Sequence, residues 1–266
     1  MRRTIHDLRQ LAATRKLASL TCYDASFADL LDDAGIDILL VGDSLGMVIQ
    51  GHASTLPVTV GDVAYHTRAV ARGARTAWIV ADMPFGSYQA SPEQALRNAV
   101  ELMQAGADMV KLEGGEEMAA TVAFLGARGV PVCGHVGLTP QHVQTLGGYR
   151  IQGKDAAGAE RVLAGARAIE DAGAAMLVIE AVPHGLAERI VAQRRSLVIG
   201  IGASAACDGQ VLVLHDMLGI SPGKRPRFVK DFLADGGSIE AAVRRYVDAV
   251  RIGAFPGPEH VYPDEA

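Results

Sequence analysis

The sequence predicts a single-domain α/β protein in which eight parallel strands, each followed by a helix, close into a (β/α)8 barrel. Short apolar runs rich in Val, Ile and Leu alternate with longer helical patterns along the whole chain, an order that requires parallel strands joined by crossovers. The length of 266 residues suits such a barrel as one domain spanning 1–266. The alternative, an open doubly wound sheet, is disfavoured because no GxGxxG motif follows the first strand and no Walker motif is present.

The elements follow one another in a regular order. The N-terminal segment 1–16 predicts a short amphipathic helix placed before the first strand. The first seven strands are predicted from apolar runs rich in β-branched residues. These runs are too short for free-standing helices and end in polar or glycine-rich turns. These strands are predicted at 17–23, 37–44, 76–82, 108–114, 130–136, 176–182 and 196–203.

The segments between these strands predict helices. The best defined of them begins with Ser91 as N-cap and Pro92 in its first turn, and Gly106 ends it. The others are predicted at 26–34, 59–72, 116–128, 155–172 and 184–194, with a final helix at 238–253 before a C-terminal tail.

The eighth strand has two candidate segments. Residues 208–218 predict either a strand or, with Asp208 as its cap, a buried helix. Residues 226–232 (PRFVKDF) precede the final helix, as the eighth strand of a barrel should. The prediction places strand eight at 226–232.

The composition restricts the possible partners and compartments. The formal net charge of −5 and the lack of a long basic run argue against nucleic acid as a partner. No apolar run approaches the length of about 18 residues that a membrane span needs, and the N-terminus lacks the apolar core of a secretory signal. Three distant cysteines, Cys22, Cys133 and Cys207, fit a reduced, cytoplasmic compartment better than a disulfide framework or a zinc site.

Acidic residues fall at the carboxyl ends of four predicted strands. Asp43, Asp82, Glu113 and Glu180 each end an apolar run. In a barrel these strand ends form the mouth that holds the active site. A single acid at such a position often caps the following helix, but four of them are hard to explain as caps.

Three of these acids predict a metal site. Asp43, Asp82 and Glu113 end strands two, three and four, which are neighbours about 4.8 Å apart. Their carboxylates can therefore converge on one hard cation, and oxygen ligands without His or Cys favour Mg²⁺ over zinc. Without a cation the three carboxylates repel one another, which raises their pKa values.

Three further residues complete the predicted site. Lys111 lies two residues before Glu113 and points to the same side of the strand, where it forms an internal salt bridge, binds a ligand, or does both. Glu180 lies on strand six, across the barrel from strand two, and is free to act as a general base on whatever the metal holds. His135, at the end of strand five, either hydrogen-bonds a substrate or is a structural histidine.

The same segments resemble the ketopantoate hydroxymethyltransferase family. The similarity extends from about residue 4 to 262, and its most specific motifs are GDSLGM followed by QGHASTLPVT, and VCGHVGLTPQ. The resemblance implies a cytoplasmic TIM-barrel enzyme of pantothenate biosynthesis that assembles into decamers of stacked pentamers.

The resemblance also implies a reaction and the roles of residues. A hydroxymethyl group would pass from 5,10-methylenetetrahydrofolate to 3-methyl-2-oxobutanoate and give 2-dehydropantoate. By motif, Mg²⁺ would be bound by Asp43, Asp82 and Glu113, and Glu180 would be the catalytic proton acceptor. Mg²⁺ would polarise the keto group and stabilise an enolate. The substrate-binding residues would be Asp43, Ser44, Asp82 and Lys111, with His135 near the transferred group.

The chain departs from the family pattern at one position, and two alternative functions remain. The family usually has a glycine where this chain has Ser204, which puts the shape of that loop or its folate contacts in doubt. A Mg²⁺-dependent keto-acid lyase or aldolase of the isocitrate lyase type would use the same enolate chemistry. A catalytically silent barrel that serves as an assembly scaffold is the alternative from another class, although a scaffold has no use for acids at the mouth.

Overall fold

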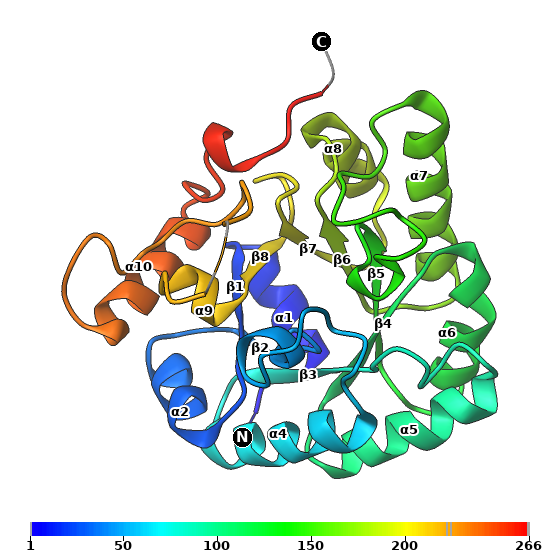
Figure 1. The fold of residues 1–266 in the computed structure, drawn as a ribbon, viewed down its shortest axis with the longest axis horizontal. Helices are drawn as coiled ribbons and strands as arrows, with labels where there is room; N and C mark the ends of the chain where they lie inside the picture. Colours follow the sequence, from blue (N-terminus) through cyan, green and yellow to red (C-terminus); the bar gives the residue numbers. More distant parts are fainter. Residues whose placement is uncertain (1, 222, 224, 265–266) are drawn as a thin grey trace.

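The computed structural model describes residues 2–221, 223 and 225–264. Its centre is a closed barrel of eight parallel strands in chain order, with β1 paired to both β2 and β8 (Figure 1). The predicted (β/α)8 barrel is thereby confirmed. The strands are β1 (Leu17–Thr21), β2 (Ile38–Val41), β3 (Trp78–Asp82), β4 (Met109–Glu113), β5 (Val132–Gly137), β6 (Met176–Glu180), β7 (Leu197–Ile201) and β8 (Gly209–Leu212).

Helices surround the barrel, and the main core of Val, Ile, Leu and Ala side chains lies around and inside the strands. The helices are α1 (Ile5–Ala12), α2 (Ala25–Asp33), α3 (Leu45–Val48), α4 (Val60–Gly73), α5 (Pro92–Gln104), α6 (Ala119–Gly126), α7 (Ala156–Asp171), α8 (His184–Gln193), α9 (Leu214–Met217) and α10 (Ile239–Arg251). Short 3-10 turns lie at η1 (Glu116–Met118), η2 (Pro140–His142) and η3 (Pro258–His260).

The start of α5 is the one that the sequence predicts. The Ser91 side chain accepts a hydrogen bond from the backbone N–H of Gln94, and Pro92 occupies the first turn of α5. The predicted N-terminal helix is α1, which Thr4 and Asp7 begin with a reciprocal capping box. The final predicted helix is α10, which packs against β1, β8 and α2.

The prediction for strand eight is wrong. The strand is β8, which pairs with β7 and β1, and the described residues within 226–232 form no strand. Only residues 202–208 separate β7 from β8, and this turn satisfies its own polar groups because the Ser204 carbonyl accepts from Cys207 and Gln210. No helix connects β7 to β8, so the alternation of strands and helices, on which the prediction rests, is interrupted at this point. The apolar side chains of Phe228 and Phe232 are buried outside the sheet.

Buried acids tie together the end of the barrel where the strands begin. Asp32 accepts hydrogen bonds from the backbone N–H groups of Thr76 at 2.9 Å and Ala77 at 2.8 Å. This contact fixes the start of β3, and hydrogen bonding lowers the pKa of Asp32 although burial opposes it. Other acids bind the starts of β1 and β7 in the same way. We call these four residues the N-end acids: Asp32, Asp37, Glu170 and Asp208.

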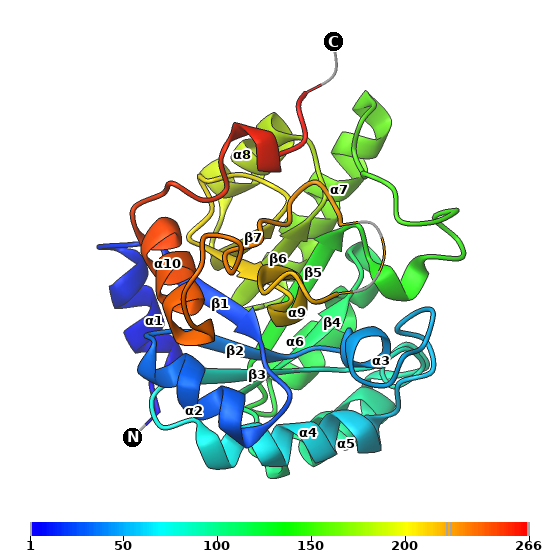
Figure 2. The same cartoon turned by 60° about the vertical axis from the view of Figure 1, so that its left-hand side comes forward.

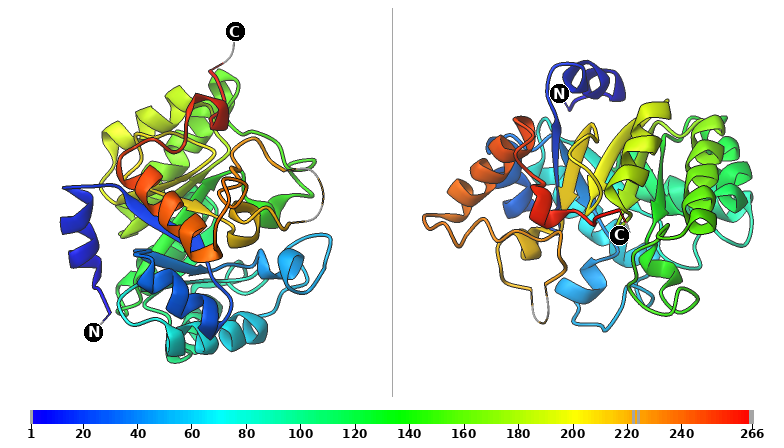
Figure 3. Two further views of the ribbon diagram at one scale, coloured as in Figure 1. Left: turned by 90° about the vertical axis from the view of Figure 1, so that its left-hand side faces the viewer. Right: turned by 90° about the horizontal axis from the view of Figure 1, so that it is seen from above.

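The opposite end of the barrel carries the long loops. The segments that follow β2, β5 and β8 rise on the same side of the molecule, as Figure 2 shows. Helix α1 lies at the other end, away from these loops (Figure 3, right). The C-terminal tail returns to this region, where the backbone of His184 donates to Tyr262. Among the described residues, no helix has the length and apolar character needed to cross a lipid bilayer.

Candidate active site

A cavity of about 880 Å³ opens at the carboxyl ends of the strands. Its wall contains every residue that the sequence predicts for the site, so residues from five different βα units come together in one place. These residues are Asp43, Ser44, Asp82, Lys111, Glu113, His135 and Glu180.

The strand register explains this convergence. Lys111 pairs with Asp82 across β3 and β4, and Glu113 pairs with His135 across β4 and β5. Glu180 pairs with Gly137 at the end of β6. The predicted position of Glu180 across from β2 follows from the closed strand order. We call Asp43, Asp82, Glu113 and Glu180 the mouth acids.

Asp43 and Asp82 lie side by side on the cavity floor. The backbone N–H of Asp43 donates to Asp82 Oδ2 at 2.9 Å, and both side chains are buried. Burial and the negative charges of Asp82 and Glu113 raise the pKa of Asp43 well above its usual range. The floor therefore holds more negative charge than its own cations neutralise.

Lys111 is the buried cation of the floor. Its Nζ lies 2.8 Å from Asp82 Oδ1, so the predicted internal salt bridge exists. Burial lowers the pKa of Lys111, but Asp82, Glu113 and Asp43 outweigh that effect and raise it. The ammonium group therefore stays charged and adds one fixed positive charge beside the aspartates.

Glu113 contacts a hydrogen-bond donor and a histidine. Its Oε2 accepts a hydrogen bond from the backbone N–H of Gln141 at 3.0 Å, and its Oε1 lies 3.4 Å from His135 Nδ1. Burial raises the pKa of Glu113, but His135, Lys111 and Gln141 lower it overall. Among the described residues no three His, Cys, Asp or Glu side chains form a ready group of metal ligands. The predicted trio shares one cavity, with Gln141 between Glu113 and Asp43.

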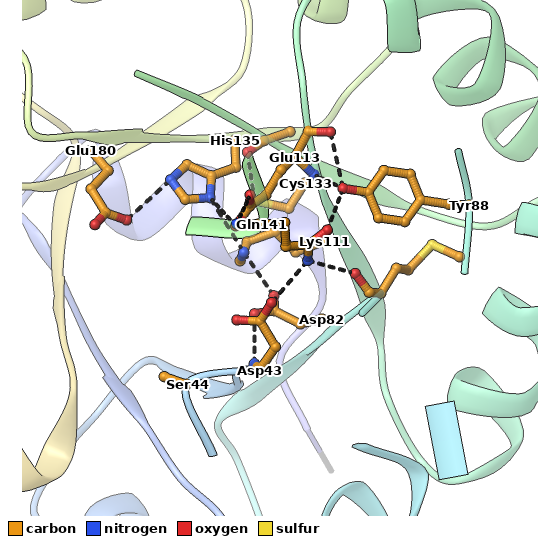
Figure 4. A network of polar contacts seen from close by, with 12 residues as sticks. Asp43, Ser44, Asp82, Tyr88, Lys111, Glu113, Cys133, His135, Gln141 and Glu180 are labelled. Atoms are coloured by element: carbon orange, nitrogen blue, oxygen red, sulfur yellow. Dashed lines mark hydrogen bonds and ion pairs between the residues drawn. The ribbon is translucent and has the colours of Figure 1, made fainter. Parts of the chain in front are cut away.

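His135 connects the two sides of the cavity (Figure 4). Its Nε2 lies 3.2 Å from Glu180 Oε2, opposite its contact with Glu113. Burial and Lys111 lower the pKa of His135, but Glu113 and Glu180 outweigh them and raise it to about 9. The side chain of Glu180 is 14% exposed, whereas that of Glu113 is 1% exposed. Glu180 is therefore the mouth acid with access to the open cavity.

Gln141 is a site residue to which sequence reasoning gave no role. Its Nε2 donates to Asp43 Oδ2 at 2.9 Å and to the Met83 carbonyl at 3.0 Å, while its backbone N–H holds Glu113. The hydroxyl of Tyr88 donates to Gln141 Oε1 at 2.7 Å (Figure 4). The signal was present, because Gln141 ends the motif VCGHVGLTPQ, but a neutral amide within a 3-10 turn does not belong to the pattern of acids at strand ends.

Ser44 and Ser204 occupy different environments. Ser44 lines the cavity, and its Oγ lies 2.9 Å from the buried hydroxyl of Tyr23. Ser204 is buried beside the β7–β8 turn, its Oγ accepts from the backbone of Ala206, and it is not part of the cavity wall. The departure at Ser204 therefore affects the turn itself and leaves the wall of the cavity unchanged.

Two backbone positions fix Glu180. Gly137 has φ +93°, and a side-chain carbon there would collide with the carbonyl oxygen of Glu180. Ala181, directly after Glu180, has φ 47°. Residues other than glycine rarely adopt this left-handed backbone conformation, which costs about 1 kcal/mol or more. Its backbone N–H donates to Ile201 on the next strand at 3.0 Å. The turn after the mouth acid is therefore held in place by its neighbours.

Comparisons with known proteins identify the family of the chain. The chain matches the model of the family "Ketopantoate hydroxymethyltransferase" over residues 2–258. It is 59% identical over 262 residues to 3-methyl-2-oxobutanoate hydroxymethyltransferase of Dechloromonas aromatica (strain RCB), which covers 98% of this chain and 96% of the relative. The enzyme of the same name from Burkholderia multivorans (strain ATCC 17616 / 249) is 62% identical over 250 residues, with 94% and 92% covered.

Solved structures share the barrel at low sequence identity. A phosphonopyruvate hydrolase in complex with oxalate and Mg²⁺ has a TM-score of 0.60 and 15% identity, with 97% of this chain and 93% of that chain covered. A 2,3-dimethylmalate lyase of the PEP mutase/isocitrate lyase superfamily has a TM-score of 0.57 and 17% identity, with 80% and 78% covered. These two show a common fold. The family match and the near-full-length relatives confirm the resemblance seen in the sequence: the chain belongs to the ketopantoate hydroxymethyltransferase family and is a transferase.

Proposed function

We propose that the enzyme transfers a hydroxymethyl group from 5,10-methylenetetrahydrofolate to 3-methyl-2-oxobutanoate and uses Mg²⁺ to stabilise negative charge on the keto acid. One observation carries the proposal. Glu180 faces the open cavity from the side opposite Asp43 and Asp82, so a molecule on the floor lies between a base and a negatively charged, cation-binding surface. The names of the relatives support the hydroxymethyl transfer and the keto acid.

The donor atoms on the floor fit Mg²⁺. Asp43, Asp82 and Glu113 supply carboxylate oxygens, the ligands that this cation prefers. Among the described residues, the four mouth acids outnumber the buried cationic side chains beside them, Lys111 and His135. The raised pKa of Asp43 is consistent with that excess of negative charge. A bound Mg²⁺ would offset it and supply positive charge beside a keto oxygen. The fold neighbour solved with oxalate and Mg²⁺ is consistent with such chemistry on this barrel.

The side chains of the chain itself handle the proton and the substrate. The C3–H bond of the keto acid breaks, the proton moves to the carboxylate of Glu180, and the electron pair forms the C2–C3 double bond of the enolate. Water adds to the one-carbon unit of the folate, both of its C–N bonds break, and the two protons of water go to the two folate nitrogens. The enolate carbon bonds to the resulting formaldehyde-level carbon, whose oxygen takes the proton from Glu180 and becomes the hydroxyl group. Lys111 and Ser44 hold the carboxylate of the substrate, and His135 holds Glu180 in position.

The deciding experiment supplies the protein with 3-methyl-2-oxobutanoate, 5,10-methylenetetrahydrofolate and Mg²⁺. We expect tetrahydrofolate and 2-dehydropantoate in equal amounts, with EDTA abolishing the reaction. A lyase of the isocitrate lyase type would instead cleave a carbon–carbon bond without consuming the folate. That result would overturn the proposal, and a protein that binds neither substrate would favour the scaffold.

A further inference from the structure

The cavity is much larger than a keto acid of five carbons. Its volume of about 880 Å³ lies in the upper part of the range found for pockets that hold drug-sized ligands. Under the proposed function the small keto acid occupies the floor, where Lys111 and a Mg²⁺ held by the carboxylates would balance its charge, so most of the volume lies above it. A second and longer molecule therefore has room in the outer part of the cavity.

Charge is divided between the two levels of the cavity. The floor is acidic, whereas the outer wall carries three arginines from two long loops, Arg150, Arg225 and Arg227. Arg225 is already paired, because its guanidinium lies 3.1 Å from Asp231 and donates to the Gly219 carbonyl. Within the described part of the chain, Arg150 and Arg227 have no acidic partner. Arg227 is anchored only through Nε, which donates to the Glu259 carbonyl at 3.0 Å.

Aromatic side chains line the path from the floor to these arginines. Burial together with the charges of Asp43, Glu180 and Glu113 raises the pKa of Tyr149, so this tyrosine next to Arg150 lies near the mouth acids. The charges of Glu180 and Arg227 both act on Tyr262: burial and Glu180 raise the pKa of its hydroxyl, and Arg227 lowers it. Two tyrosines, Tyr149 and Tyr262, therefore line the same cavity as the two guanidinium groups.

We propose that Arg150 and Arg227 form an anion subsite that binds carboxylates on the tail of the one-carbon donor. This inference rests on the proposed function. The reacting carbon of the donor must reach the floor, so an elongated donor places its far end at the outer wall. Guanidinium groups bind carboxylates with two parallel hydrogen bonds. The subsite therefore favours donors of the tetrahydropterin class whose tail carries several carboxylates, such as polyglutamylated folates.

The test compares Arg150→Gln, Arg227→Gln and the double variant on donors with one and with five glutamates. Ion pairs on exposed arginines are individually weak, so each single change should raise KM for the pentaglutamyl donor about threefold. The double change should raise it about tenfold, with a smaller effect on the monoglutamyl donor. KM for the keto acid and kcat should not change. Arg189→Gln, an exposed arginine on α8 outside the cavity wall, is the matched control.

Two results separate this inference from the proposed function. If the wild-type enzyme turns over folate but the double variant keeps its KM for the pentaglutamyl donor, the subsite is wrong and the function stands. If the wild-type enzyme neither turns over the donor nor binds pentaglutamyl tetrahydrofolate in calorimetry, the function is wrong and the subsite with it. Salt provides an independent check, because it should raise the wild-type KM for the pentaglutamyl donor more than that of the double variant.

Discussion

Acidic side chains lie at both ends of this barrel, and their surroundings give them opposite consequences. The N-end acids accept backbone N–H groups, and hydrogen bonds lower the pKa of Asp32. At the mouth, burial and like charges raise the pKa of Asp43. Asp32 therefore stabilises the fold at one end, whereas Asp43 holds unfavourable negative charge at the other. The difference shows that hydrogen-bond donors and neighbouring charges, and not burial alone, decide whether the pKa of a buried acid is lowered or raised.

The largest expected effect is on proton transfer at Glu180. The change Glu180→Gln should slow exchange of the substrate C3 proton with solvent by about a thousandfold, because the amide cannot accept the proton. Proton exchange is measured by NMR in D₂O, with Mg²⁺ binding measured in parallel and expected to change little. Glu188→Gln, an exposed glutamate on α8, is the control. Unchanged exchange in the Glu180 variant would remove it as the base.

The next effect is on the cation. Asp82→Ala should weaken binding of Mg²⁺, or of Mn²⁺ followed by electron paramagnetic resonance, by more than about a hundredfold, because a ligand is lost. Wild-type metal affinity in this variant, together with EDTA-sensitive activity, would show that the metal lies elsewhere. The acidic excess at the mouth would then need another explanation.

The free energy of unfolding allows a direct comparison of Asp32 at one end of the barrel with Asp43 at the other. Asp32→Asn should lower the free energy of unfolding by roughly 2–3 kcal/mol, because an amide cannot replace a carboxylate that accepts several N–H groups. Asp43→Asn should raise it by roughly 1 kcal/mol in metal-free buffer, because a repelling charge is removed. The contribution of Asp32 should be present above pH 4 or so and be lost as pH falls through its lowered pKa. Urea unfolding measures both changes in the free energy of unfolding. Changes of the same sign in the two variants would contradict the difference between the two acids.

Gln141 gives a smaller effect that tests how the mouth acids are positioned. Gln141→Ala removes the amide that holds Asp43 but keeps the backbone N–H that holds Glu113. We expect metal affinity to fall about tenfold, which is typical when a hydrogen-bond partner of a ligand is lost. Gln144→Ala, on the exposed part of the same loop, is the control. If calorimetry shows wild-type metal affinity, Gln141 has no part in positioning Asp43.

The smallest effect concerns Ser204. Ser204→Gly should lower the free energy of unfolding by about 1 kcal/mol, since it removes the hydrogen bond to Ala206. KM for the folate and for the keto acid should stay the same, because Ser204 is not part of the cavity wall. A changed KM for the donor would link this turn to folate binding.

The sequence predicted the barrel because alternation of apolar runs and helices is a repeated signal, and it predicted the mouth because strand ends meet there. Strand eight was missed because β8 is four residues long and follows β7 after a short turn without a helix. Gln141 was missed because its role depends on three partners distant in the sequence. The positions of Arg150 and Arg227 depend on loop conformation, which carries no periodicity.

Several predictions from the resemblance concern properties that lie outside a single chain. The decameric assembly is one of them, and light scattering combined with size-exclusion chromatography would give the mass of the particle directly. The cytoplasmic location is another, and it stays a prediction from the reduced cysteines and the family. The decameric assembly rests on the resemblance alone, and the location rests on the resemblance and the cysteine content.

Gly137 has a consequence for how new activities could arise on this scaffold. At this level β5 and β6 lie backbone against backbone, with no space for even a methyl group beside the Glu180 carbonyl. The relative backbone positions of His135 and Glu180 are therefore set by the main-chain pairing of β5 and β6. Exchanging the loops that follow β5 and β8 would alter which reactant enters while the proton-handling pair keeps its spacing, which makes those loops natural starting points for redesign.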